Sequence, residues 1–177
     1  MSELETAPKR LPALRLPGGW IIAVLPLIWL LGLGAWVLMR WSRLPQLIPV
    51  HWNIFTGFPD FWVRRTPTTV LSVMGTMGGI CVAFIVLAWL MLQQPPPQTS
   101  PRLLAAERVF RRQSALVIVV AAWFIAFLPA FSLLPLPFGA LRIWMAVFAA
   151  AVLCGGAVLV RSGIRMHRER NGPATGQ

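Results

Sequence analysis

Four long runs of the chain contain no charged residue, and this pattern decides the expected fold class. The runs are 16–39, 66–101, 113–141 and 143–160. A helix needs about 20 apolar residues to cross the hydrocarbon core of a bilayer, and each run supplies that, although the last has only 18 residues. The runs have no polar face, as a soluble helix would, and no alternation, as a barrel strand would. The pattern predicts an all-α integral membrane protein with four transmembrane helices.

Prolines and polar residues set the expected ends of these helices. We expect helices over 20–39, 67–92, 114–134 and 141–160. Pro26 lies inside the first helix and favours a kink. Thr66 and Pro67 suit the N-cap and the first turn of the second. The first apolar run is longer than the core of a signal peptide and runs directly into Arg40, so we expect an uncleaved anchor.

The polar segments divide the chain into five expected parts. They are a basic tail (1–18), a helix–loop–helix unit (19–92) with its loop at 41–66, a proline-rich linker with an amphipathic basic helix (93–113), a transmembrane helical hairpin (114–161) and a second basic tail (162–177). Three consecutive prolines make the start of the linker extended. The amphipathic helix is expected to lie in the headgroup layer and to lead into the third span.

The positions of lysine and arginine predict an orientation. The two tails and the 93–113 segment carry eleven of them, and the other side carries five. The positive-inside rule therefore places both termini in the cytoplasm, with the 41–66 loop facing outward. This distribution explains the net charge of +11 without a nucleic-acid partner. Some arginines at the ends of spans are candidate contacts for anionic lipid headgroups. They are Arg64, Arg65, Arg108, Arg111 and Arg112.

Small residues form two stripes at helical spacing. The first stripe is Thr68, Ser72, Gly75, Gly79 and Ala83, and the second stripe is Ala146, Ala150, Cys154 and Ala157. Small side chains let helices approach closely in a membrane. Contact within the bundle is the preferred interpretation, and a homodimer interface is the alternative. No ionisable residue lies well inside a span, which speaks against an ion or proton pathway.

The 41–66 loop carries the most distinctive polar residues. Two prolines four residues apart favour an extended conformation before His51. An extended segment points His51 and Asn53 to the same side. Gly57 allows a turn, which Pro59 and Asp60 continue. The turn is expected to bring Asp60 back toward His51 and Asn53.

This loop resembles a known domain. The pattern Leu-Pro-x-x-Ile-Pro-x-His-Trp-Asn, followed by Gly-x-Pro-Asp-x-Trp, spans 44–62. It is similar to a domain of unknown function in SdpI-type membrane proteins, a family named for a bacterial immunity protein that acts against a secreted peptide toxin. The resemblance covers about 20–92. It implies a multi-pass protein of the bacterial cytoplasmic membrane that recognises an extracytoplasmic peptide, lipid or partner protein through its outer loop.

Three interpretations of the motif remain open. His51, Asn53 and Asp60 organise the loop through hydrogen bonds, or they form a recognition site, or they take part in chemistry. In the first interpretation the aromatic residues mark the membrane interface. These aromatics are Trp52, Phe55 and Trp62. For the third, His51 and Asp60 supply two ligands where a stable metal site needs three or four.

We therefore assign no catalytic residue, metal or cofactor, and an enzyme is the less favoured reading. The expected partners are the lipid bilayer and a peptide or another membrane protein. A homodimer also fits the small-residue stripes. The alternative function is a small accessory subunit of a larger membrane complex, which the small size and the stripes favour.

Overall fold

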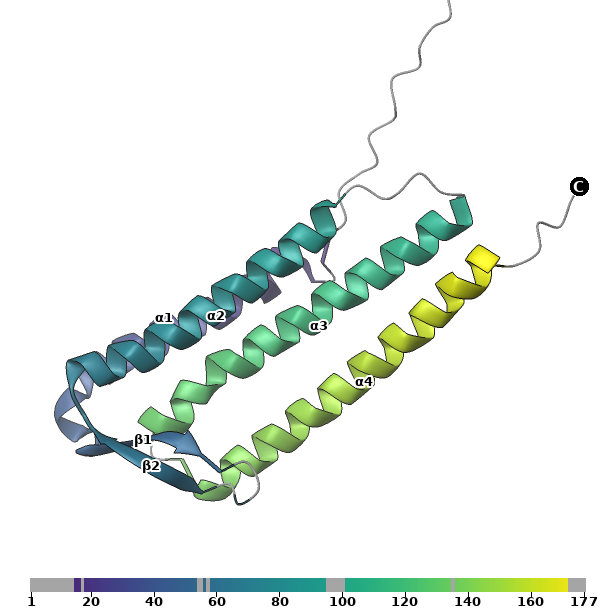
Figure 1. The fold of residues 1–177 in the computed structure, drawn as a ribbon. Helices are drawn as coiled ribbons and strands as arrows, with labels where there is room; N and C mark the ends of the chain where they lie inside the picture. Colours follow the sequence, from purple (N-terminus) through teal and green to yellow (C-terminus); the bar gives the residue numbers. More distant parts are fainter. Residues whose placement is uncertain are drawn as a thin grey trace, which may run out of the picture.

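The computed structural model describes residues 15, 16, 18–53, 56, 58–94, 101–134 and 136–171. Its elements in chain order are α1 (Gly19–Met39), the 3-10 turn η1 (Trp41–Arg43), β1 (Leu47–Trp52), β2 (Pro59–Arg64), α2 (Pro67–Gln93), α3 (Pro101–Leu133) and α4 (Phe138–Asn171). The four α-helices lie side by side in an elongated bundle, with the two strands across one end (Figure 1). All four are long and apolar enough to cross a membrane, which confirms the four predicted spans.

The helix ends near the loop follow the sequence signals. α1 runs through Pro26, and this proline is buried. α2 begins at Pro67, and the side chain of Thr66 accepts a hydrogen bond from the backbone N–H of Thr69 at 3.1 Å. Such a cap satisfies one of the N–H groups that a helix leaves unpaired at its start. The predicted cap of the second helix is therefore confirmed.

The 41–66 loop contains a β-hairpin, which the all-α expectation missed. β1 and β2 pair antiparallel, with Leu47 opposite Arg64 and Ile48 opposite Val63. The register becomes irregular between Pro49 and Trp52, because a proline inside a strand has no N–H for the ladder. The strands are rich in β-branched and aromatic residues, which suit a pleated surface. The fold is a four-helix bundle with a two-stranded sheet at one end.

The third and fourth helices are longer than expected. α3 begins at Pro101 and continues past Ser114 without a break, so the amphipathic segment 102–113 is its first part. α4 continues to Asn171, well into the segment that we assigned to a tail. The residues of both extensions are mostly strong helix formers. The sequence changes from amphipathic to uniformly apolar within α3, and the helix does not end at that point.

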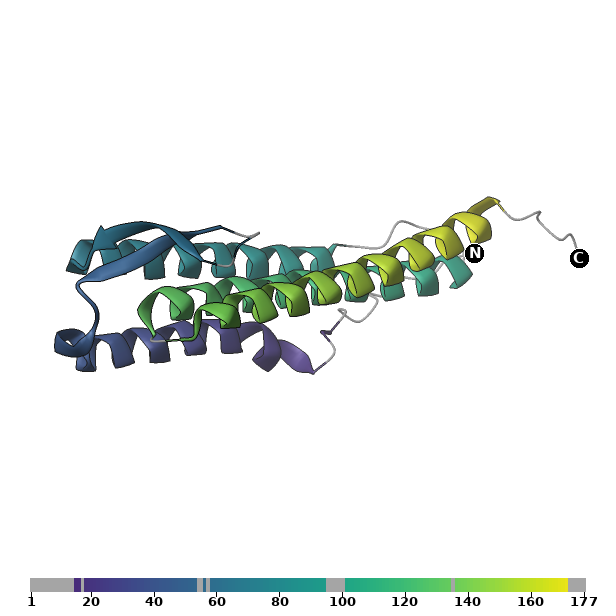
Figure 2. The same cartoon turned by 90° about the horizontal axis from the view of Figure 1, so that it is seen from below.

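α3 is the central helix and contacts α1, α2 and α4. Aromatic rings connect it to the outer helices. Phe127 of α3 stacks on Trp29 of α1 with ring centroids 4.6 Å apart, and it meets Trp144 of α4 at 4.8 Å. Phe124 stacks on Phe148 of α4 at 3.7 Å. Figure 1 shows α1 and α2 on the side of α3 that faces away from α4, and Figure 2, seen from below, shows that α1 and α2 are separate helices.

Both small-residue stripes face away from the bundle. The first stripe lies on α2 and the second on α4, and we call them the α2 stripe and the α4 stripe. Every residue of both stripes is exposed. The preferred interpretation, contact within the bundle, is therefore wrong for these residues. The close approach of α3 and α4 occurs instead at Gly155, where an added Cβ would lie 2.8 Å from a methyl carbon of Val117. Because a bilayer is apolar on the outside as well, small residues do not reveal which side of a helix is packed.

Candidate functional site

The hairpin is fixed to the bundle through β1. Ile48 is only 1% exposed and belongs to one apolar cluster with Val37 of α1, Val70 of α2 and Leu133 of α3. Three helices therefore hold this strand. β2 lies on the outside, with Phe61 58% exposed. The anchoring role of Ile48 was not predicted, because the alternation in a six-residue strand is too short to read.

Arg65 joins the two ends of the 41–66 loop through hydrogen bonds to backbone carbonyls. Its Nη1 atom donates to the carbonyl oxygens of Trp41 and Leu44, both at 2.5 Å, and its guanidinium lies 5.2 Å from the centre of the Trp41 ring. Its backbone N–H donates to the carbonyl of Gln46 at 2.7 Å. Carbonyls just after a helix lack partners within that helix, and an arginine satisfies them well. Arg65 thus joins the end of α1 to the start of α2, whereas its neighbour Arg64 is exposed.

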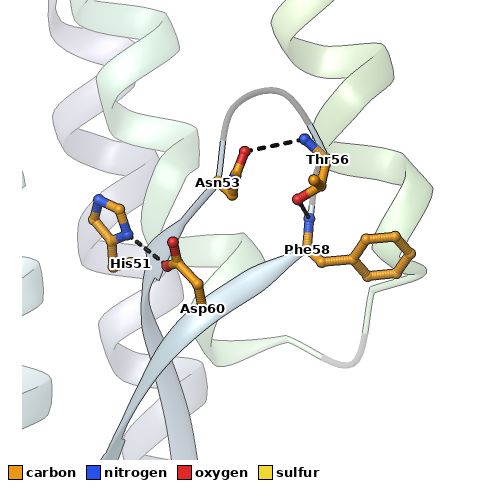
Figure 3. A network of polar contacts seen from close by, with 5 residues as sticks. All are labelled: His51, Asn53, Thr56, Phe58 and Asp60. Carbon is orange, nitrogen blue, oxygen red and sulfur yellow. Dashed lines mark hydrogen bonds and ion pairs between the residues drawn. The ribbon is translucent and has the colours of Figure 1, made fainter.

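His51 and Asp60 form an exposed pair on the two strands. The Nδ1 atom of His51 lies 2.5 Å from Oδ1 of Asp60, so the turn brings Asp60 to His51 as expected (Figure 3). The side chains are 68% and 46% exposed. Ion pairs as exposed as this one contribute about 0–1 kcal/mol to stability. The pair therefore contributes little to the stability of the hairpin, which the burial of Ile48 already anchors to the bundle.

Asn53 organises the turn. Its side-chain Oδ1 atom accepts a hydrogen bond from the backbone N–H of Thr56 at 3.1 Å. The backbone N–H of Asn53 donates to the backbone carbonyl of Phe58 at 3.0 Å. The N–H of Phe58 donates to Oγ1 of Thr56 at 3.3 Å (Figure 3). An Asn side chain that bonds the backbone a few residues ahead is a common turn device. The predicted turn residue Gly57 lies outside the described residues, and Pro59 is the first residue of β2.

The aromatic residues of the motif divide into an inner and an outer group. Trp52 is half-buried, and its indole N–H is buried without a hydrogen-bond partner. Trp62 is 44% exposed and Phe58 is 53% exposed. The guanidinium of Arg142, near the start of α4, lies 5.9 Å from the centre of the Phe58 ring. Phe55 lies outside the described residues.

The arginines at the opposite end of the bundle have different surroundings. Arg111 pairs with Glu107 one turn earlier, and its Nη1 donates to the carbonyl of Gln94 at the end of α2. The two side chains of this pair are only 11% and 17% exposed, so Arg111 holds α3 to the end of α2. Arg108 is half-buried and Arg112 is exposed. Contact of these arginines with headgroups stays a prediction.

The chemistry open to the hairpin is limited. Within the described part of the chain, no group of three or more His, Cys, Asp or Glu side chains could hold a metal ion. His51 and Asp60 offer two ligands. They also offer a carboxylate and an imidazole to a bound partner, beside exposed aromatic rings.

The chain was compared with known protein families, with characterised proteins and with solved structures. None of them matches it. The likeness to SdpI-type proteins therefore rests on the residues of the 44–62 motif. The geometry adds that the motif residues fall on two strands and a turn at one end of a bundle of four helices that are long and apolar enough to cross a membrane.

Proposed function

We propose that this chain is a multi-pass protein of the bacterial cytoplasmic membrane, of SdpI type, that recognises an extracytoplasmic peptide through its hairpin. In this proposal both termini are cytoplasmic and the hairpin faces outward, in accordance with the positive-inside rule. The observation that carries the proposal is the exposed His51–Asp60 pair, which joins the two strands of a well-anchored hairpin.

The energetic argument favours recognition over loop organisation. Ile48 and Arg65 hold the hairpin through burial and hydrogen bonds. The His51–Asp60 pair is exposed and adds little to stability. Polar groups that stability does not require, placed on a rigid support, are available for a ligand.

The form of the hairpin favours a peptide as that ligand. The described residues contain a two-stranded sheet, so the second edge of β2 has no strand partner among them. Extended peptides bind such edges through backbone hydrogen bonds, and side-chain contacts supply the specificity. Beside this edge Phe61 and Trp62 offer apolar surface, and Asp60 offers a carboxylate to a basic side chain.

The test replaces the pair and leaves the turn intact. His51→Ala/Asp60→Ala removes both polar groups, whereas Asn53 is kept because its loss would open the turn. Cells that express this variant should lose protection against a panel of membrane-active peptides, measured as growth inhibition. Ser42→Ala/Gln46→Ala is the matched control, because both residues are exposed in the same loop. Equal protection by the variant and the wild type would refute the proposal, provided that both insert equally.

The exposed small-residue stripes favour a second candidate, an accessory subunit that packs laterally against another membrane protein. Gly75 and Gly79 of the α2 stripe have no atom within 4 Å of an added Cβ, so the isolated chain tolerates larger residues there. Gly75→Leu/Gly79→Leu should release a partner that co-purifies in mild detergent. A chain that runs alone before and after the substitution would exclude this role.

A further inference from the structure

A cavity lies between α3 and α4 at the end of the bundle opposite the hairpin, where these helices run side by side (Figure 1). Its volume is about 650 Å³. Ala106 and Val109 line it from α3, and Val158, Arg161 and Arg165 line it from α4. We propose that this cavity binds one anionic phospholipid, with the phosphate on the two arginines.

The sequence of α4 builds the cavity in an amphipathic order. Val158, Arg161 and Arg165 are three and four residues apart, so they follow one another along a single face of the helix. The apolar residue comes first, toward the middle of the span, and the cations follow toward its end. On the facing helix, the small side chain of Ala106 leaves room that a larger residue would fill.

A hydrogen bond holds the two walls together. Oγ of Ser162 donates to Oε1 of Gln113 at 2.6 Å, and both residues line the cavity. Further into the span, Gly155 brings α4 close to Val117 of α3. The cavity therefore lies between two helices that are joined at its inner end. Its shape is fixed by these contacts before any ligand binds.

A second cavity of about 710 Å³ is also lined by these arginines. It shares Arg161 and Arg165 with the first, and its further lining is Ala157, Val160, Ile164 and Arg168. Two hollows that share one pair of cations match a lipid with two acyl chains and one phosphate. Arginine suits phosphate because its planar donors bind two oxygens together.

The charge pattern excludes simpler occupants. An acyl chain alone offers no anionic group to the arginines, and inorganic phosphate offers no apolar group to the apolar walls. Basic pockets between helices at the ends of membrane spans are suited to anionic headgroups. Each arginine near a membrane surface contributes about 1 kcal/mol to such binding. Loss of both arginines should therefore weaken binding about thirtyfold.

The experiment titrates the full-length protein in detergent with phosphatidylglycerol and counts bound lipid by native mass spectrometry. Arg161→Gln/Arg165→Gln should weaken binding about thirtyfold. The control is Arg40→Gln/Arg43→Gln, which removes two exposed charges beside the hairpin, at the opposite end of the bundle from the cavity. The control should change affinity less than threefold. Equal losses in the two variants, or no loss in the first, would overturn the proposal.

A second variant tests the apolar wall. Ala106→Phe fills the cavity and keeps both arginines, so phosphatidylglycerol binding should fall at least tenfold. Unchanged lipid affinity in this variant would count against the site. Glycerol 3-phosphate is the probe for the headgroup alone. If millimolar glycerol 3-phosphate displaces the lipid completely, the site binds free phosphate and the lipid assignment is wrong.

Discussion

Replacing Arg65 by glutamine should destabilise the protein, and the same change at Arg64 should not. The two arginines are neighbours and carry the same charge, but they face different surroundings. The guanidinium of Arg65 is half-buried and donates to two backbone carbonyls. Arg64 is exposed. The comparison separates an internal support of the hairpin from a simple surface charge.

The contacts of Arg65 give the expected magnitude. A hydrogen bond from a charged donor contributes about 1.5–3 kcal/mol to stability. The lower value applies to both bonds here because the side chain is partly exposed, which gives a total of about 3 kcal/mol. The contact with the Trp41 ring, at 5.2 Å, adds about 0.5–1 kcal/mol. For a chain of this size, 3 kcal/mol corresponds to a fall in melting temperature of about 6–12 °C.

Thermal unfolding of the purified protein in lipid nanodiscs measures this difference, with tryptophan fluorescence as the signal. Trp41, which lies in contact with Arg65, is one of the nine tryptophans that contribute to this signal. Arg65→Gln should lower the apparent melting temperature by several degrees at any salt concentration. Arg64→Gln should change it by less than about 2 °C. Equal shifts for the two variants, or a shift for Arg65→Gln that disappears in zwitterionic lipid, would show that Arg65 acts on the bilayer instead.

Three further substitutions test the bundle by the same measurement. Thr66→Ala removes the cap of α2 and should cost about 1 kcal/mol; an unchanged melting temperature would contradict the cap. Trp29→Ala should cost about 3–5 kcal/mol, whereas Trp29→Phe should cost much less because the indole N–H is buried without a partner. Gly155→Ala should destabilise through its contact with Val117, and added Val117→Ala should restore stability; Gly156→Ala, which meets no atom within 4 Å, is the control.

The spans were predictable because their signal lies in single, continuous stretches of sequence. Each helix must be apolar over its whole crossing length. The cap at Thr66 is equally local, since it involves residues three apart. The ends of α3 and α4 were misjudged for the same reason. The sequence changes polarity at Gln113 and at Arg161 without a residue that stops a helix.

The hairpin and its anchors depend on contacts that the sequence does not display. β1 has six residues and a proline in its middle, so its alternation is short and broken. Asp60 was expected near His51 because a turn of few residues separates them. The partners of Arg65 lie 21 and 24 residues earlier in the chain, and no local pattern connects them. The packing side of each stripe was also hidden, because lipid and protein present the same apolar surroundings.

α3 connects the two proposed sites physically. At one end, Ala130 and Leu133 pack in the cluster that holds β1, and at the other, Ala106 and Val109 line the cavity beside α4. α4 depends on α3 for most of its contacts, and none of the most apolar 18-residue stretch of α4 is buried. A lipid between α3 and α4 would therefore stabilise the helix that the protein itself holds least. Loss of that lipid should loosen α4, while the hairpin keeps its support from α1, α2 and α3. Effects on peptide protection and on lipid binding should then separate, since each site has its own anchoring contacts on a shared central helix.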